Sequence, residues 1–281
     1  MSSILITGGT GTFGRAFVAR AVLDYERVCV YSRGEHAQAE MRQTYAGYDQ
    51  LRFFIGDVRD KDRLRRAMDG VDVVVHAAAL KRIEVAEYDP MEVVKTNILG
   101  AMNVIEAATD ARVFGVRKVV ALSTDKACDP VNAYGASKLL AEKMFIAANN
   151  GRGANGPLFA CVRYGNVTNS AGSVIPKWRE ILKTSDTVPV TDPECTRFHM
   201  RIEWAVDLVL HAIESMKGGE MFVPDLPAYR LGDLAEALGA KMRVTGLPEF
   251  EKRNESMVRG VTSADVKRMS VDEIRSELAA L

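Results

Sequence analysis

The sequence lacks a surplus of charge of either sign. Among its 281 residues, Lys and Arg together number 37 and so do Asp and Glu, so the formal net charge at pH 7 is zero. A balanced charge provides no general attraction to nucleic acid or to an anionic membrane. We therefore expect neither as a partner, although a local cationic pocket for phosphate is compatible with these totals.

Cysteine and histidine are scarce, with four residues of each type. Cys29, Cys128, Cys161 and Cys195 are far apart in the chain and form no Cys-x-x-Cys pair. Two of them lie in apolar runs typical of strands, which favours buried, reduced thiols over disulfides. The histidines show no metal-ligand spacing, and we predict no metal site.

Long apolar runs are also missing. None reaches the roughly 18 residues needed to cross a bilayer. The first residues, MSSILITGG, enter a strand-like run without the charged and apolar segments of a secretory signal. With 47% hydrophobic and 26% charged residues, the composition is that of a globular protein, and we expect it in the cytoplasm.

Short apolar runs alternate with segments of helical periodicity in the first part of the chain. Runs that are apolar throughout are typical of strands buried on both faces, so the alternation predicts an α/β fold with a doubly wound parallel sheet. The predicted strands are 3–7, 27–32, 51–57, 72–79, 118–124 and 158–166. The predicted helices are 13–24, 34–46, 60–69, 90–111 and 133–149.

The pattern loosens after about residue 167. We expect helices at 174–184, 203–216 and about 230–238, and a short strand within 220–224. The prediction is therefore a Rossmann domain over 1–167 and a smaller substrate-binding cap over 168–281. The boundary is approximate, and the cap need not be continuous.

A glycine-rich turn follows the first predicted strand and opens an amphipathic helix. Gly8, Gly11 and Gly14 give the spacing G-x-x-G-x-x-G. Glycine permits the turn and lets the backbone approach a pyrophosphate, while the helix start offers N–H groups and a positive dipole. In this context the motif predicts dinucleotide binding. The predicted contacts of this turn also include Thr10, Thr12 and Phe13.

The second predicted strand ends without the carboxylate that usually binds the ribose 2′-hydroxyl of NAD. Ser32 and Arg33 stand there instead and suit a 2′-phosphate, which predicts NADP as the cofactor. Glu35 lies close enough to leave NAD as an alternative, and Arg33 alone could be a solvated loop residue. Asp57, followed by Val58, is placed either to contact the adenine edge or to cap the next helix.

The fifth predicted strand ends in the run STDK (123–126), and Tyr134 and Lys138 follow one helical turn apart. Positions i and i+4 share a helix face, so both side chains can point at a dinucleotide. We expect the ammonium and a cationic nicotinamide to lower the Tyr134 pKa from about 10, so that the phenolate takes a proton from an alcohol as hydride leaves. A surface pair on a helix is the structural alternative.

Several segments together resemble the extended short-chain dehydrogenases. They are the glycine turn, HAAALK (76–81), LSTDKA (122–127), YGASK (134–138) and RYGNV (163–167). More narrowly, the chain resembles the UDP-N-acetylglucosamine 4,6-dehydratases, especially the C5-inverting branch of bacterial surface-sugar pathways. FFIGDVRD (53–60), AEYDP (86–90) and TRF (196–198) also fit that branch. The resemblance implies a nucleotide-sugar substrate, tightly bound NADP and assembly as a dimer or hexamer.

The resemblance also implies a role for each residue of the site. Tyr134 and Lys138 would oxidise C4 as hydride passes to NADP⁺, and Thr124 would hydrogen-bond the C4 oxygen. Lys126 would remove the C5 proton, Asp125 would protonate the leaving C6 hydroxyl, and the hydride would return to C6. The product would be a 4-keto-6-deoxy sugar with C5 inverted. Retaining relatives carry Glu at the position of Lys126, so the Asp-Lys pair points toward inversion.

The Asp-Lys pair is chemically coherent without the resemblance. A buried carboxyl has a raised pKa and can donate a proton near neutrality. An ion pair between Asp125 and Lys126 that merely closes the loop is the structural alternative. At the level of function, the alternatives are a nucleotide-sugar 4-epimerase, a variant dehydratase on another nucleotide sugar, or an NADP-binding module without catalysis.

The resemblance implies further contacts and shows two departures. The substrate contacts are Lys81, Asn166, Lys177 and Arg197, because cations suit a pyrophosphate and an amide can bond a sugar or base. The remaining cofactor contacts are Ala77, Ala78, Ala79, Lys81, Ser123, Tyr134, Lys138, Tyr164 and Val167. The departures are residues 248–256, which replace a PGEKLHE-like loop, and His199, which stands where Trp is expected. We expect both departures to lie at the positions that distinguish one nucleotide or sugar from another.

Overall fold

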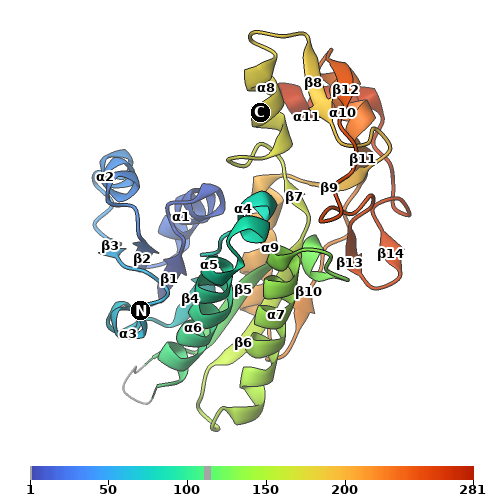
Figure 1. The fold of residues 1–281 in the computed structure, drawn as a ribbon. Coiled ribbons are helices and arrows are strands. Elements are labelled where there is room, and N and C mark those ends of the chain that lie inside the picture. Colours follow the sequence, from blue (N-terminus) through green and yellow to red (C-terminus); the bar gives the residue numbers. More distant parts are fainter. Residues whose placement is uncertain (1, 111–114) are drawn as a thin grey trace.

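Seven parallel strands form the central sheet in a computed structural model, which describes residues 2–110 and 115–281 (Figure 1). Their order is β10-β6-β5-β4-β1-β2-β3. Their bounds are β1 (Ser3–Thr7), β2 (Arg27–Ser32), β3 (Leu51–Ile55), β4 (Val73–His76), β5 (Lys118–Thr124), β6 (Leu158–Tyr164) and β10 (Met221–Phe222). The order reverses direction at β1, as in a doubly wound sheet, so the predicted fold class is confirmed.

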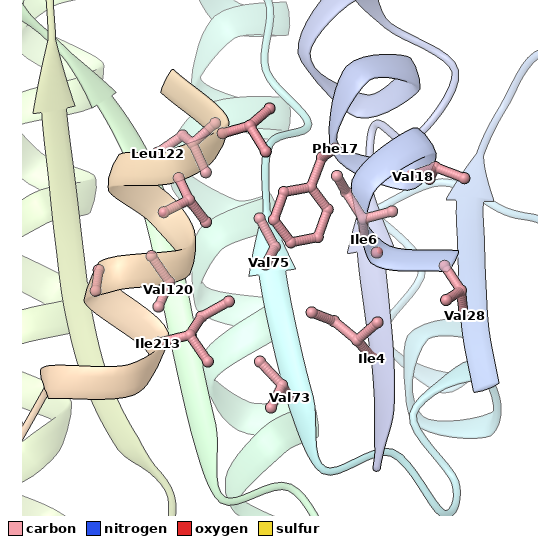
Figure 2. Close-up of a cluster of buried hydrophobic side chains, with 14 of the residues drawn as sticks. Ile4, Ile6, Phe17, Val18, Val28, Val73, Val75, Val120, Leu122 and Ile213 are labelled. Carbon is pink, nitrogen blue, oxygen red and sulfur yellow. The ribbon is translucent and has the colours of Figure 1, made fainter. Parts of the chain in front are cut away.

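Helices cover both faces of the sheet. On one face lie α1 (Thr12–Asp24), α2 (Glu35–Thr44) and α9 (Ile202–Ser215), and on the other α3 (Lys61–Ala67), α6 (Gly100–Thr109) and α7 (Ala133–Gly151). Successive strand residues point to opposite faces, so Ile4 and Ile6 join one apolar core while Leu5 joins the other. Figure 2 shows Phe17 of α1 and Ile213 of α9 packed over the first of these cores.

The predicted helix at 90–111 consists of three pieces, and residue 111 lies outside the described residues. These pieces are α5 (Pro90–Val93), a π-helical turn η1 (Val94–Leu99) and α6. The π turn directs Asn97 toward the loop after β4, where its Nδ2 donates to Leu80 O at 2.9 Å and its Oδ1 accepts from Leu80 N at 2.8 Å. Asn97 Nδ2 also lies 3.0 Å from Ser137 Oγ of α7, so this turn ties the loop to that helix.

The C-terminal part builds small sheets and a separate apolar core beyond one end of the central sheet (Figure 1). Its strands are β7 (Asn166–Val167), β8 (Thr187–Val190), β9 (Thr196–Met200), β11 (Ala228–Arg230), β12 (Lys241–Val244), β13 (Ser256–Val258) and β14 (Val261–Thr262). Its helices are α8 (Val174–Ile181), α10 (Leu231–Ala237) and α11 (Val271–Ala279), whose core includes Trp178, Leu234 and Ile274.

Two elements of the second half return to the central sheet. Helix α9 covers β5 and β6, and β10 extends the sheet beside β6. Residues 202–215 and 221–222 therefore pack with the central sheet, although they follow residue 167. The division at residue 167 into a Rossmann domain and a cap stays a prediction. Several elements had no counterpart among the predicted ones: α4 (Ile83–Tyr88), a 3₁₀ turn η2 (Asp125–Ala127), the helix α11 and the short strands β8, β9, β11, β12, β13 and β14.

All four cysteines are buried and free, in agreement with the sequence-based expectation. Among the residues that the structure describes, no group of His, Cys, Asp or Glu is arranged to hold a metal ion. Within the same described ranges, no helix combines the length and apolar character required to cross a bilayer.

Candidate active site

A cavity of about 820 Å³ opens between the central sheet and the C-terminal part. It is lined by every residue that the sequence analysis proposed for cofactor, substrate or catalysis. These residues are Gly8, Thr10, Gly11, Thr12, Phe13, Gly14, Ser32, Arg33, Asp57, Val58, Ala77, Ala78, Ala79, Lys81, Ser123, Thr124, Asp125, Lys126, Tyr134, Lys138, Tyr164, Asn166, Val167, Lys177 and Arg197. The roles of these residues remain predictions.

The glycine turn is closely packed on its own backbone and on the loop after β4. Gly8 has φ +69°, and a Cβ there would lie 2.9 Å from Ala78 N. A Cβ at Gly14 would lie 2.5 Å from the backbone of Gly9. No side chain caps the start of α1, where Gly11 is the N-cap residue, so its first N–H groups remain open to a ligand.

The end of β2 presents a hydroxyl whose hydrogen-bonding role is set by a neighbour. Gln38 Nε2 lies 3.0 Å from both Ser32 O and Ser32 Oγ, and 2.9 Å from Phe54 O. An amide nitrogen only donates, so Ser32 Oγ accepts at this contact. The hydroxyl hydrogen of Ser32 is therefore left to donate to an acceptor in the cavity, as a phosphate oxygen would be.

Arg33 extends the same end of the cavity toward Asp57. Its Nη1 lies 3.7 Å from Asp57 Oδ2, and both side chains are partly exposed. Asp57 Oδ1 accepts a hydrogen bond from Arg59 N at 3.0 Å. The N-cap of α3 is Asp60, whose side chain accepts from Arg63 N. Asp57 therefore does not cap this helix. Contact between Asp57 and the adenine edge of a cofactor stays a prediction.

Helix α7 brings Tyr134 against the end of β5. The side chain of Asn132 caps this helix by accepting from Gly135 N at 2.7 Å. A Cβ at Gly135 would lie 2.2 Å from Lys126 O, so the missing side chain allows the helix to approach η2. One turn later, Lys138 Nζ donates to Leu122 O.

The ionisation of Tyr134 differs from the expectation. Burial raises the pKa of Tyr134 to about 12, while Lys126 and the Thr124 side chain act against burial. The amine that favours the phenolate is therefore Lys126, and the lowering expected from Lys138 is not found among the protein's own groups. Burial lowers the pKa of Lys138 itself.

Three ionisable side chains meet beside Tyr134. Lys126 Nζ lies 3.1 Å from Asp125 Oδ1 and 3.1 Å from Glu255 Oε1. Thr124 Oγ1 donates to Asp125 Oδ1 at 2.9 Å. The other carboxylate oxygen, Asp125 Oδ2, is buried and has no hydrogen-bond partner among the described residues. This oxygen can therefore carry a proton toward a bound molecule.

The three groups shift one another's pKa. Burial raises the pKa of Asp125, and Glu255 adds to this effect while Lys126 opposes it. Burial alone would lower the pKa of Lys126, but the carboxylates of Asp125 and Glu255 outweigh burial and raise it. Burial likewise opposes ionisation of Glu255, yet Lys126, Arg197 and Lys252 together hold its pKa at about 2. The cluster thus contains a buried ammonium between a firmly ionised carboxylate and one that readily takes a proton.

The proposed substrate residues differ in how firmly the protein holds them. Arg197 Nη1 donates to Thr196 O and Arg253 O, and Nη2 lies 3.4 Å from Glu251 Oε2. Lys177 is exposed, and its Nζ is 4.0 Å from Glu84 Oε1. Arg197 is therefore fixed by the protein, whereas Lys177 can move to a ligand.

Asn166 and Lys81 are the other two residues proposed to bind the substrate. Asn166 Oδ1 is buried without a hydrogen-bond partner in the described part of the chain, so it is an acceptor that a ligand could satisfy. Burial, together with the neighbouring Arg82, lowers the pKa of Lys81. Both observations are typical of side chains that bind a polar ligand.

A family model described as "Polysaccharide biosynthesis protein" matches residues 4–274. The chain belongs to this family. It is 46% identical over 261 residues to a UDP-N-acetylglucosamine 4,6-dehydratase (inverting) of Campylobacter jejuni, which covers 91% of this chain and 77% of that protein. It is also 42% identical over 267 residues to a UDP-glucose 4-epimerase of Rickettsia typhi, with the same coverage of 91% and 77%. Pen from Bacillus thuringiensis has a similar structure, with a TM-score of 0.95, 32% identity and coverage of 100% of this chain and 98% of Pen.

Sequence reasoning missed part of the site in this member of the polysaccharide biosynthesis protein family. Glu251 and Glu255 line the cavity, and both fall in the segment 248–256 that departs from the expected loop. The departure was visible in the sequence, but no spacing rule indicated which of its residues would reach Lys126. Gly165 also lines the cavity, and it packs closely on β9, since a Cβ there would lie 2.5 Å from Phe198 Cβ.

The second departure lies elsewhere. His199 does not line this cavity, and its ring nitrogens face Thr168 Oγ1 at 3.0 Å and Glu277 Oε2 at 3.2 Å. Its ring also lies edge-on to Trp204. We expected His199 to lie where the protein distinguishes one substrate from another, and this expectation is wrong, because its side chain points outside the cavity.

Proposed function

We propose that this protein is an NADP-dependent nucleotide-sugar 4,6-dehydratase that acts on a UDP-N-acetylglucosamine-type substrate and inverts C5. The observation that carries the proposal is the Asp125–Lys126 couple beside Tyr134, in one cavity with the glycine turn. The Campylobacter relative, which is named for this reaction, supports it.

Oxidation at C4 is assigned to Tyr134 and Thr124. The phenol oxygen of Tyr134 receives the proton of the C4 hydroxyl, and Thr124 orients the C4 oxygen. NADP, held by the glycine turn, Ser32 and Arg33, would supply the acceptor for the C4 hydride and the donor for C6. Its positive nicotinamide also favours the phenolate, and Lys126 contributes in the same direction.

The acid and the base of the elimination arise from one proton transfer. Lys126 is an ammonium next to a carboxylate, and moving its proton to Asp125 across 3.1 Å yields a neutral amine and a protonated carboxyl. The amine then takes the C5 proton, which the C4 ketone has acidified. The carboxyl gives its proton to the C6 oxygen, whose bond to carbon breaks as water leaves. A solvent proton that reaches C5 from the opposite face completes the inversion.

NADP is proposed over NAD because of the end of β2. The hydroxyl of Ser32 is left as a donor by Gln38, and Arg33 adds a guanidinium near the same position. Both groups suit a 2′-phosphate, and no carboxylate occupies the place where NAD-binding sites usually carry one.

The test is incubation of the purified protein with UDP-N-acetylglucosamine in deuterated water. We expect loss of the C6 hydroxyl and deuterium at C5, detected by mass spectrometry and proton NMR. Substrate recovered without label after prolonged incubation would contradict the proposal.

A second candidate is a nucleotide-sugar 4-epimerase, favoured by the relative from Rickettsia. This reaction needs the same Tyr134 and the cofactor, but it does not need proton transfer at C5 or C6. A product with inverted C4 and an intact C6 oxygen selects it.

We further propose that the chain forms a homo-oligomer through one helical surface. Leu99 and Met102 near the start of α6, and Leu140 of α7, are exposed apolar side chains on neighbouring helices. A second copy covering them would remove apolar area from water.

Residues 1–167 and 168–281 are proposed as the nucleotide-binding and substrate-binding parts of each copy.

A further inference from the structure

Glu255 is the one member of the buried charged cluster without a role in the reaction described above. It lies immediately before β13, 130 residues after Asp125 in the chain, and its side chain is 3% exposed. Its Oε1 approaches Lys126 Nζ to 3.1 Å, the same distance as Asp125 Oδ1. Lys126 therefore contacts two carboxylates that come from segments far apart in the chain.

The backbone around Glu255 is fixed independently of Lys126. Glu255 N donates to Ser263 Oγ at 3.0 Å, and Ser263 N donates to Glu255 O at 2.7 Å. Lys252 Nζ donates to Cys128 O at 2.8 Å and lies 3.1 Å from Glu255 Oε2, as an ion pair without hydrogen-bond geometry. The carboxylate is therefore held in place before any substrate arrives.

The charges that face Lys126 come from several elements. Asp125 belongs to η2, Glu255 immediately precedes β13, and Arg197 belongs to β9. Two phenols also lie near Lys126, that of Tyr134 on α7 and that of Tyr229 on β11. Arg197 opposes an ammonium at this position, and the two phenols are neutral near pH 7 because burial raises their pKa. Two anions thus face one competing cation, and Glu255 is the anion that does not exchange a proton in the proposed reaction.

We propose that Glu255 is a positioning residue that sets the basicity of Lys126 for the chemistry at C5, an inference that rests on the proposed dehydratase reaction. Its charge stabilises the ammonium that forms when Lys126 takes the C5 proton. The same charge disfavours a second carboxylate at Asp125, so it also favours the proton on Asp125 when Lys126 releases one. Glu255 thereby increases the proton affinity of both partners while it remains ionised.

The first experiment measures the protonation of Lys126 directly, in the cofactor-loaded protein without a sugar. Lysine labelled with ¹⁵N at Nζ and ¹³C at Cε gives an NMR signal that reports ammonium or amine, and Lys126→Arg identifies it. We expect Glu255→Gln, which removes the charge and keeps the size, to move the pH at which this signal changes downward by roughly 1–3 units. A signal that changes at the same pH as in the unaltered protein overturns the proposal.

Two further variants separate charge from structure. Glu277 lies on α11, outside the cavity, and pairs with Arg201. We expect Glu277→Gln, which removes this carboxylate, to leave the Lys126 signal unchanged. Glu255→Asp keeps the charge but withdraws it by one methylene, and we expect a smaller shift in the same direction. If Glu255→Gln does not fold, Glu255→Asp decides alone, since an unshifted Lys126 signal in this variant also contradicts the proposal.

The second experiment uses the reaction. With UDP-N-acetylglucosamine in deuterated water, Glu255→Gln should slow deuterium uptake at C5 at least tenfold while transient cofactor reduction at C4 stays within about twofold, because one unit of pKa is a factor of ten in the proton equilibrium. Equal slowing of both steps would indicate a structural role instead. If the unaltered protein forms no deoxy product, the proposed function fails, whereas the NMR titration still decides the role of Glu255.

Discussion

At the scale of single residues, Tyr134 shows how a buried phenol depends on charges supplied by its partners. Burial raises its pKa to about 12, and Lys126 is the group of the protein that opposes this most strongly. In the proposed reaction, a cation placed by the cofactor would act in the same direction as Lys126 and favour the phenolate over the phenol.

Replacing Tyr134 by Phe removes the only proton acceptor proposed for the C4 hydroxyl. We expect this variant to lose C4 oxidation by a factor of at least 10² while it still binds NADP. Absorbance of the reduced nicotinamide in a single turnover measures the loss. Tyr25→Phe, which alters a tyrosine outside the cavity, is the control and should oxidise normally.

Gln38 offers a test of cofactor choice without any sugar. Gln38→Leu removes the amide that leaves the Ser32 hydroxyl free to donate, so we expect the Kd for NADP⁺ to rise about three- to tenfold, as for the loss of about one hydrogen bond. The Kd for NAD⁺ should change less. Calorimetric titration measures both, and Gln43→Leu on the exposed side of α2 is the matched control. Equal weakening for both cofactors would argue against a role in discrimination.

At the scale of elements, the central strands and most flanking helices could be predicted because their apolar periodicity is strong. The ends were harder: β3 stops at Ile55 and β4 at His76, although apolar residues continue to Ala79. Those residues leave the sheet to line the cavity, a tertiary requirement that local pattern does not encode. The short strands of the C-terminal part pair with distant segments, as β9 does with both β7 and β11, and short runs carry little signal of their partners.

The same limit applies to the site. The glycine turn, Asp125 with Lys126, and Tyr134 with Lys138 each form a local motif, so the sequence predicted their convergence. Glu255 reaches Lys126 only because β13 packs against η2, and nothing in the neighbouring residues indicates that contact.

Helix α7 provides a test of how closely elements must approach. Gly135→Ala would place a Cβ 2.2 Å from Lys126 O, and the helix would have to move away from η2. We expect a loss of activity of at least tenfold together with lower stability, since overpacking typically costs about 1–3 kcal/mol. Gly151→Ala, at the other end of α7, meets nothing within 4 Å and should leave activity and melting temperature unchanged. Equal effects of the two substitutions would refute this account of the helix contact.

At the scale of the whole molecule, the proposed subunit contact predicts a change of assembly state. Leu140→Glu places a charge on the exposed apolar surface of α7, and we expect the protein to shift toward the monomer. Light scattering after size exclusion measures the mass. Leu23→Glu alters a more exposed leucine on α1, on the other face of the sheet, and should leave the mass unchanged. Identical masses for both variants and the unaltered protein would place the contact elsewhere.

Buried His76 makes the stability of the molecule depend on pH. Burial, assisted by Lys138, lowers its pKa to about 3, from an ordinary value of about 6.5. Below pH 6.5 the unfolded chain binds a proton that the folded protein does not, so stability falls as pH decreases toward 3, by at most about 1.4 kcal/mol per pH unit. Urea unfolding between pH 7 and 5 measures this slope. His76→Asn, whose side-chain amide can still hydrogen-bond to Thr7, should show a flatter dependence, and parallel slopes would contradict the assignment.

The late position of Glu255 in the chain has a consequence for synthesis on the ribosome. A nascent polypeptide that has emerged as far as β6 carries the glycine turn, Tyr134 and Lys126, whereas the second anion beside that lysine arrives only with β13. Asn132, which caps α7, also donates to Phe250 O, so the C-terminal segment secures the helix that bears the tyrosine. A chain that ends before residue 250 would carry the glycine turn, Tyr134 and Lys126, but it would lack both the second anion beside Lys126 and the contact between Asn132 and Phe250 O.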